Sequence, residues 1–360
     1  MKLQNLLTLA LGVFFAFTAC KKDDDDTPGV NYPSKLEEIK FTSSALVGNF
    51  FGDPAERKVL IYTPPGYDPK GTKTYPVVYL LHGMPFGDSS YVDPNRWATM
   101  YEKPDFPKQG FKAWLDSLIT AKAIAPLLVA MPDAKTKYGF CFYTNSVLQG
   151  NYEDFIAEDL VDYMDGHYKT IANRHGRSVI GHSQGGYGAV RMGLMRSETF
   201  GTVAAHVGIL WLDGLKEGNP FLLLENPNGF NGPIPGYSLT AVTYGMAAAW
   251  SPNMNNPPWY VDIPVDYPSG ASRQDIFNKW LAHDPYTLLD SHAAHLRTLN
   301  GLYIDAALDD PWKDLPAKFH DGLINHNVPH QYYTFKGGHF NKMFERLELS
   351  LKYCSEMMGN

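Results

Sequence analysis

The amino-acid sequence predicts an α/β fold with a mostly parallel, doubly wound sheet and a long irregular insertion near residues 210–290. Two observations support this fold class. Short apolar runs alternate with helical patterns along most of the chain, which is the order of elements that builds a parallel sheet covered on both faces. Hydrophobic residues make up 44% of the 360 residues, so the chain can bury one sizeable core.

The N-terminus has the pattern of an export signal. A charged Met1-Lys2 start precedes an apolar stretch from Leu6 to Phe17, and small residues lead up to Cys20. The apolar stretch is too short to span a bilayer. This segment resembles a bacterial lipoprotein signal, which implies that Cys20 becomes the lipidated first residue of the mature protein. An ordinary cleaved secretion signal is the alternative interpretation.

The expected domain boundaries follow from this pattern. We expect residues 1–19 to be the signal peptide, residues 20–36 to be a flexible acidic tether, and residues 37–360 to form the folded domain. The acidic run after the cysteine also resembles the surface-export signal of lipoproteins in some Gram-negative bacteria. These resemblances imply a protein that is held at the bacterial outer membrane by a lipid anchor only, and that is exposed at the cell surface.

Seven short apolar runs are the expected strands: residues 58–62, 77–81, 127–131, 178–180, 203–207, 302–304 and 331–333. Helical patterns lie between several of them, at about residues 109–121, 152–168, 185–196, 313–326 and 338–357. Residues 210–290 break the alternation, because they are dense in Pro, Gly, Asn, Trp and Tyr. A segment of this length is either a lid or binding wall, or an irregular but rigid packing segment.

The run Gly181-His182-Ser183-Gln184-Gly185 contains the candidate nucleophile. In α/β-hydrolases the nucleophilic serine stands on a sharp turn between a strand and a helix, written G-x-S-x-G. Here an apolar run precedes the motif and a helical pattern follows it. The sequence therefore predicts the α/β-hydrolase fold, with Ser183 as the nucleophile of an enzyme that cleaves esters through an acyl-enzyme.

A serine hydroxyl needs a base, and the base needs a carboxylate that holds its tautomer. In this fold the chain order is Ser, acid, His. Among the later histidines, His339 alone has a glycine-flanked loop position after an expected strand. The acid is expected after the strand that ends near Asp305, where Asp309 and Asp310 lie side by side. The residues alone leave both open, whereas Asp305 lies inside the strand and is less able to reach the base.

Two backbone N–H groups are candidates for the oxyanion hole. Gln184 directly follows the nucleophile at the start of a helix, and Met84 lies in the turn after the strand at residues 77–81. His82 in the same turn is expected to be structural.

Composition excludes several other classes of function. A net charge of -7, with no basic run outside the extreme N-terminus, argues against a nucleic-acid partner. The chain has no H-E-x-x-H, no finger-spaced cysteine pair, no P-loop and no dinucleotide motif after a strand, so no metal and no cofactor are expected. We expect Cys141 and Cys354 to be free, although their separation does not decide whether they pair.

The motifs together resemble the esterase family of α/β-hydrolases that contains S-formylglutathione hydrolases, mycolyl transferases, feruloyl esterases and acetylxylan esterases. The resemblance covers residues from about 55 to 355 and rests on Val77–Gly83, Gly181–Gly186, Leu302–Asp310 and Gly337–His339. It implies Asp310 as the acid and Met84 as the second oxyanion donor. In this family the loop that carries the catalytic acid has the sequence pattern Gly-Thr-x-Asp. Because Ala307 and Leu308 depart from this pattern, Asp309 remains a second candidate for the acid.

Secreted members of this family from polysaccharide-degrading bacteria remove feruloyl or acetyl groups from plant cell-wall xylan, which implies a polysaccharide-linked ester as substrate. The alternatives are an acyltransferase that uses the same triad, and a non-catalytic carbohydrate-binding lipoprotein on a hydrolase scaffold. The oligomeric state is not predicted. Six aromatic residues are candidates for contact with a ferulate ring or a sugar, although core packing is the commoner use of each: Trp211, Tyr237, Trp250, Trp259, Tyr260 and Trp312.

Overall fold

The computed structural model describes residues 32–83, 87–234, 236 and 238–358. The predicted signal peptide, most of the tether with Cys20, and the residues Met84 and Tyr237 lie outside this described part. No helix within it is both long enough and apolar enough to cross a membrane.

The core of the fold is an eight-stranded sheet with the order β1-β2-β4-β3-β7-β8-β9-β10. The β1/β2 and β2/β4 pairs are antiparallel and the others are parallel, which confirms the predicted mostly parallel sheet. The strands are β1 Lys35–Thr42, β2 Glu56–Thr63, β3 Val77–Leu81, β4 Leu128–Pro132, β7 Arg177–His182, β8 Thr202–His206, β9 Gly301–Ala307 and β10 Gln331–Phe335. All seven expected strands are present. β1 was not expected, and it begins before the predicted domain boundary at residue 37.

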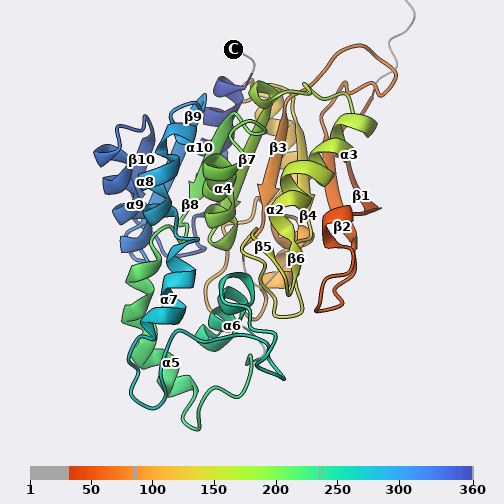
Figure 1. Ribbon diagram of the computed structural model, residues 1–360. Coiled ribbons are helices and arrows are strands. Elements are labelled where there is room, and N and C mark those ends of the chain that lie inside the picture. Colours follow the sequence, from red (N-terminus) through yellow and green to blue (C-terminus); the bar gives the residue numbers. More distant parts are fainter. Residues whose placement is uncertain (1–31, 84–86, 235, 237, 359–360) are drawn as a thin grey trace, which may run out of the picture. The chain divides into compact units, whose positions relative to one another are not determined.

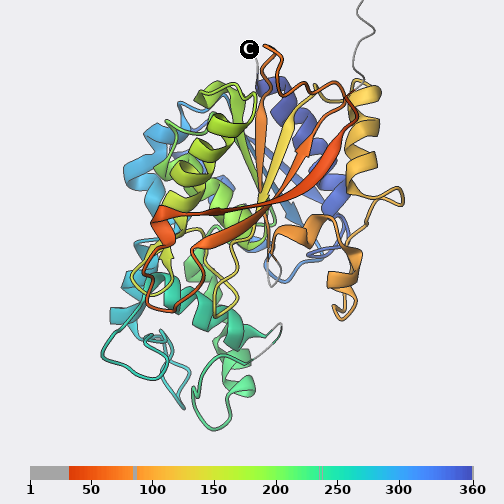
Figure 2. The same cartoon turned by 90° about the vertical axis from the view of Figure 1, so that its right-hand side faces the viewer.

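Both faces of the sheet are covered, because alternate residues of a strand point to opposite sides. In β3, Val77, Tyr79 and Leu81 belong to one apolar cluster, whereas Val78 and Leu80 belong to another. Figure 2 shows α1 and α10 on one side of the sheet and α3 and α4 on the other. Burial on both faces explains why the central strands read as continuous apolar runs.

The helices that cover the sheet agree with the predicted ones within a few residues at most ends, except for the helix at Pro285–Leu296, which was not predicted. They are α1 Phe111–Thr120, α4 Gln184–Met195, α8 Pro285–Leu296, α9 Asp314–Asn325 and α10 Met343–Met357, together with α2 Tyr152–Asp154, which runs through a π-helical turn into α3 Leu160–His167. The last helix was predicted to begin at residue 338 but begins at Met343. Asp105 explains this start, since its carboxylate accepts the N–H groups of Phe344 and Glu345 in the first turn.

The insertion near residues 210–290 is irregular in part, since residues 251–273 contain no helix, but elsewhere it holds helices that were not predicted. It contains a 3₁₀ segment at Leu212–Gly218 and the helices α5 Asn219–Glu225, α6 Leu239–Trp250 and α7 Gln274–Leu281, which lie together in the lower part of Figure 1. These elements share an apolar cluster that includes Trp250 and Trp280 and that extends to Phe140, Phe142 and Tyr187 outside the insertion. Two of the polar residues in this stretch are helix caps, Ser238 before α6 and Asp284 before α8. The helices are short, so the turn residues between them hid their periodicity.

Candidate active site

Ser183 stands on a strained turn between β7 and α4. It has φ 58° and ψ −118°, a region that a non-glycine residue occupies only when its surroundings enforce it. Its N–H donates to the carbonyl oxygen of His206 at 2.9 Å. A Cβ on Gly181 would collide with the carbonyl oxygen of Gly185, and one on Gly185 would collide with that of Leu81. The two motif glycines are therefore required by the close approach of neighbouring backbone.

His339 is paired with Asp310 and not with Asp309. The Nδ1–H of His339 donates to Asp310 Oδ2 at 2.5 Å, and the N–H of Trp312 donates to Asp310 Oδ1 at 3.0 Å. The Asp310 side chain is 2% exposed, whereas Asp309 is exposed to solvent. Burial alone would raise the pKa of Asp310, but the hydrogen bond and the charge of His339 lower it overall. The carboxylate form of Asp310 is therefore the one that faces the imidazole.

The loop that carries His339 is held by two residues that sequence reasoning did not identify as site residues. His182 Nε2 donates to the carbonyl oxygen of His339 at 2.6 Å, and Glu102 accepts the N–H of Phe340 at 3.0 Å. Burial, together with the nearby His339, lowers the pKa of His182 to about 3, so this imidazole is neutral and its one proton lies on Nε2. His182 lies inside the serine motif, which was an available signal, but no pattern in the sequence marks Glu102.

Gln184 begins α4 and is fully buried. Its backbone N–H belongs to the first turn, where no intrahelical acceptor is available, so the group suits an oxyanion. Its side-chain Oε1 accepts the N–H groups of Cys141 and Phe142, both at 3.0 Å. Met84, the second predicted donor, lies outside the described residues. The preceding Gly83 packs against the turn that carries Ser183, since a Cβ added at Gly83 would lie 3.3 Å from Ser183 Cβ.

His82 has the structural role that was expected of it. Its Nδ1 donates to the carbonyl oxygen of Gly83 at 2.8 Å, and its Nε2 accepts the N–H of Ala134 at 3.0 Å. Asp305 is likewise engaged away from His339, because it accepts hydrogen bonds from His206 at 2.7 Å and from Arg346 at 3.0 Å.

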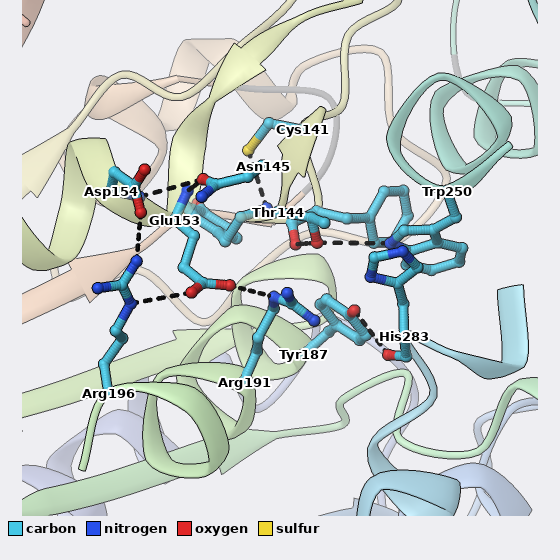
Figure 3. A network of polar contacts seen from close by, with 12 residues as sticks. Cys141, Thr144, Asn145, Glu153, Asp154, Tyr187, Arg191, Arg196, Trp250 and His283 are labelled. Atoms are coloured by element: carbon cyan, nitrogen blue, oxygen red, sulfur yellow. Dashed lines mark hydrogen bonds and ion pairs between the residues drawn. The ribbon is translucent and has the colours of Figure 1, made fainter. Parts of the chain in front are cut away.

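A buried network of polar contacts anchors α4, the helix that follows the turn at Ser183 (Figure 3). The carboxylate of Glu153 binds Arg191 at 2.7 Å and Arg196 at 2.9 Å. At the other end of the network, the hydroxyl of Tyr187 donates to the carbonyl oxygen of His283 at 2.8 Å. The helix behind Ser183 is thus tied both to the segment that contains Glu153 and to the insertion.

A cavity of about 310 Å³, which we call the ester pocket, opens over Ser183 and His339. Trp312 and the exposed Tyr101 lie at this pocket, and most of its remaining wall comes from the insertion, including Leu222, Leu239, Val242, Met246, Val265, Phe277 and Trp280. The insertion is therefore both a packed unit and a wall of this pocket.

The six aromatic residues that were candidates for substrate contact lie in different parts of the structure. Trp312 lines the ester pocket, whereas Trp250 is 3% exposed and belongs to the core of the insertion. Trp211 lines a neighbouring hollow and Trp259 lines a different one, and Tyr260 packs partly buried against the insertion core. Tyr237 lies outside the described residues. Tyr101 and Trp280 were not predicted.

Among the described residues, no group of three or more His, Cys, Asp or Glu side chains is arranged to hold a metal ion. Cys141 and Cys354 are both free and buried, and burial raises the pKa of each thiol to about 12. These thiols are therefore protonated at neutral pH and are poor nucleophiles.

Comparisons with known proteins place the chain in a family. The model of a family named Putative esterase matches residues 54–346. A curated esterase of Mycobacterium tuberculosis is 29% identical over 154 residues, which are 42% of this chain and 28% of the relative, so the match spans less than a third of that relative.

Solved structures with the same fold include two named hydrolases. A ferulic acid esterase superposes with a TM-score of 0.62 at 19% identity, and the match covers 91% of this chain and 100% of that chain. The S-formylglutathione hydrolase of Staphylococcus aureus has a TM-score of 0.57 at 15% identity, with 90% and 100% covered. At these identities the likeness confirms the predicted α/β-hydrolase fold.

Proposed function

The chain belongs to the esterase family of α/β-hydrolases, a family of carboxylic ester hydrolases, and from this premise we propose that it cleaves esters through an acyl-enzyme. Ser183 attacks the ester carbonyl while His339 takes its proton, and Asp310 orients the imidazole. The N–H groups of Gln184 and Met84 hold the oxyanion. His339 then protonates the departing alcohol, and water repeats the steps in reverse to free the acid.

The observation that carries this proposal is the position of the strained serine and of the His339–Asp310 pair at one pocket. Ser183→Ala is expected to abolish hydrolysis of p-nitrophenyl acetate and labelling by a fluorophosphonate probe. Ser197→Ala, a buried serine just beyond the end of α4, is the matched control and should keep both. Turnover by a correctly folded Ser183→Ala variant, judged by its circular dichroism spectrum, would refute the mechanism.

We further propose that the substrate is a feruloyl or acetyl ester of plant cell-wall polysaccharide. The ester pocket favours the larger feruloyl group, because an acetyl group would leave most of a cavity of about 310 Å³ unfilled. Its mainly apolar wall, which includes Phe277 and Trp280, suits an aromatic ring.

A panel of methyl ferulate, acetylated xylan and formylglutathione tests the acyl preference. We expect the highest kcat/KM with methyl ferulate, and a preference for formylglutathione would contradict the proposal. Analysis of the products formed in the presence of a sugar alcohol separates hydrolysis from acyl transfer, since a hydrolase releases the free acid.

We also propose that the protein is exported and anchored to the outer membrane by lipid on Cys20. This proposal is supported by the signal-like residues before the cysteine. In cells given a radiolabelled fatty acid, the protein should take up label and sediment with outer membranes, and Cys20→Ala should lose both properties. A Cys20→Ala variant that still carries label would contradict the anchor.

A further inference from the structure

A second hollow, which we call the side pocket, lies next to the ester pocket and has a volume of about 220 Å³. The two pockets share lining residues, among them Leu239, Pro311 and Trp312. The residues that belong to the side pocket alone include Trp211, Phe221, Glu217 and Asp314. A substrate whose ester lies at Ser183 can therefore extend past Trp312 into the side pocket.

We propose that the side pocket binds a sugar unit of the chain that carries the ester, and that it is a subsite for the alcohol side of the substrate. The proposal rests on the proposed function, because it assumes a carbohydrate-linked ester. A pyranose ring has apolar C–H faces and a rim of hydroxyl donors. It is therefore matched by a site that combines aromatic surfaces with oxygen acceptors.

The aromatic surfaces of the side pocket are held in place before any ligand arrives. Trp211 packs so closely on Gly214 that a Cβ there would lie 2.7 Å from the indole ring, and Lys318 Nζ lies 5.8 Å from the ring centroid. The ring of Trp312 lies against Gly218, at 3.4 Å from the position of an added Cβ. Rings that are already ordered lose little conformational entropy when a ligand binds.

The carboxylates separate the two pockets chemically. Glu225 is the carboxylate that lines the ester pocket, but it already accepts hydrogen bonds from the N–H groups of Leu239 and Thr240. In the described part of the chain, neither Glu217 nor Asp314 of the side pocket forms an ion pair, and both are exposed. Their oxygens are thus available to accept sugar hydroxyls, and hydrogen bonds to ionised acceptors are the stronger kind. The ester pocket suits the acyl group and the side pocket suits the sugar.

Trp312 links the two pockets to the catalytic residues. Its ring lines both pockets, and its backbone N–H holds Oδ1 of Asp310. A sugar seated on one side of this residue would therefore position the ester relative to His339. For this reason Trp312 itself is unsuited to a test of sugar binding, since its replacement would also disturb the acid.

Phe221 offers a cleaner test, with Leu224 on the same helix as the matched control. Both side chains are exposed, by 62% and 77%, but Leu224 lines neither pocket. Calorimetric titration of the full chain with unesterified xylotetraose should give saturable binding. Phe221→Ala should weaken it about tenfold and Glu217→Gln several-fold, whereas Leu224→Ala should bind as the wild type does.

The same variants are compared on two esters. Phe221→Ala should lower kcat/KM for a feruloylated xylo-oligosaccharide about tenfold relative to its kcat/KM for methyl ferulate, because only the first ester reaches the side pocket. Absence of xylotetraose binding at millimolar concentration, or equal binding by wild type and Phe221→Ala, would overturn the subsite. The titration does not depend on turnover, so failure to hydrolyse any ester would count against the proposed function and not against the sugar site.

Discussion

Replacing Asp310 by Asn changes one atom of the buried acid, and the structure predicts how the amide will lie. Oδ1 of Asp310 accepts the N–H of Trp312, so the amide oxygen has to occupy that position. The amide nitrogen then lies where Oδ2 now accepts from His339 Nδ1 at 2.5 Å. An amide nitrogen only donates, so His339 would have to accept at Nδ1 and carry its proton on Nε2. That tautomer cannot take the proton of Ser183.

The expected loss can be estimated from two effects. The imidazolium that forms during catalysis loses a charge-assisted hydrogen bond, worth about 1.5–3 kcal/mol. Selection of the wrong tautomer adds a cost of similar size, and together the two effects, about 3–6 kcal/mol, correspond to a fall of about 10²- to 10⁴-fold in kcat. Initial rates with p-nitrophenyl acetate measure this fall, and thermal unfolding checks that the variant is folded.

Asp309→Asn is the matched control, because the Asp309 side chain is exposed and forms no hydrogen bond or ion pair within the described residues, while its backbone N–H donates to the carbonyl oxygen of Gly337. We expect its kcat to stay within about twofold of the wild type. An Asp310→Asn variant that keeps more than a tenth of the wild-type kcat would refute this reasoning. A loss in Asp309→Asn equal to that in Asp310→Asn would also refute it.

Three further predictions concern the support of the site. Glu102→Ala removes the acceptor of the Phe340 N–H and should lower kcat about tenfold in steady-state assays. Glu102→Gln keeps an acceptor oxygen and should retain most of the activity. Equal losses of kcat in the two variants would contradict this prediction. Burial lowers the pKa of His182 from 6.5 to about 3, so as the pH falls below 6.5 the unfolded chain gains a proton that the folded chain does not. Urea unfolding at pH 7, 6 and 5 should then show the wild type losing more stability than His182→Gln, by about 0.7 kcal/mol between pH 7 and 6 and about 1.2 kcal/mol between pH 6 and 5, and parallel pH profiles would contradict it. Gly185→Ala places a Cβ against a carbonyl oxygen of β3 and should lower the free energy of unfolding by more than about 3 kcal/mol in thermal unfolding. As the control, Gly166→Ala in α3 meets no atom within 4 Å and should raise that free energy by about 0.5–1 kcal/mol. A tolerated Gly185→Ala would show that the turn at Ser183 can relax.

The predicted parts of the fold are those with strong local patterns. The buried strands are continuous apolar runs, so all seven were found, whereas the exposed edge strand β1 alternates weakly and was missed. The helices of the insertion were missed for a related reason, since they are short, and the Pro in the first turn of α5 and the serine cap of α6 are residues that also occur in loops. Their assignment depends on the apolar cluster that they form together.

The sequence by itself determined the turn that presents Ser183, because the glycines, the preceding apolar run and the following helix are all local. It also determined the order of serine, acid and histidine along the chain, which points to His339 as the base. Only the tertiary structure decided between Asp309 and Asp310, since neighbouring residues point in different directions and only Asp310 faces an imidazole 29 positions away. The same holds for Glu102, which acts on a loop 238 positions later in the chain. Contacts between distant segments depend on how the whole chain packs, and no local pattern records them.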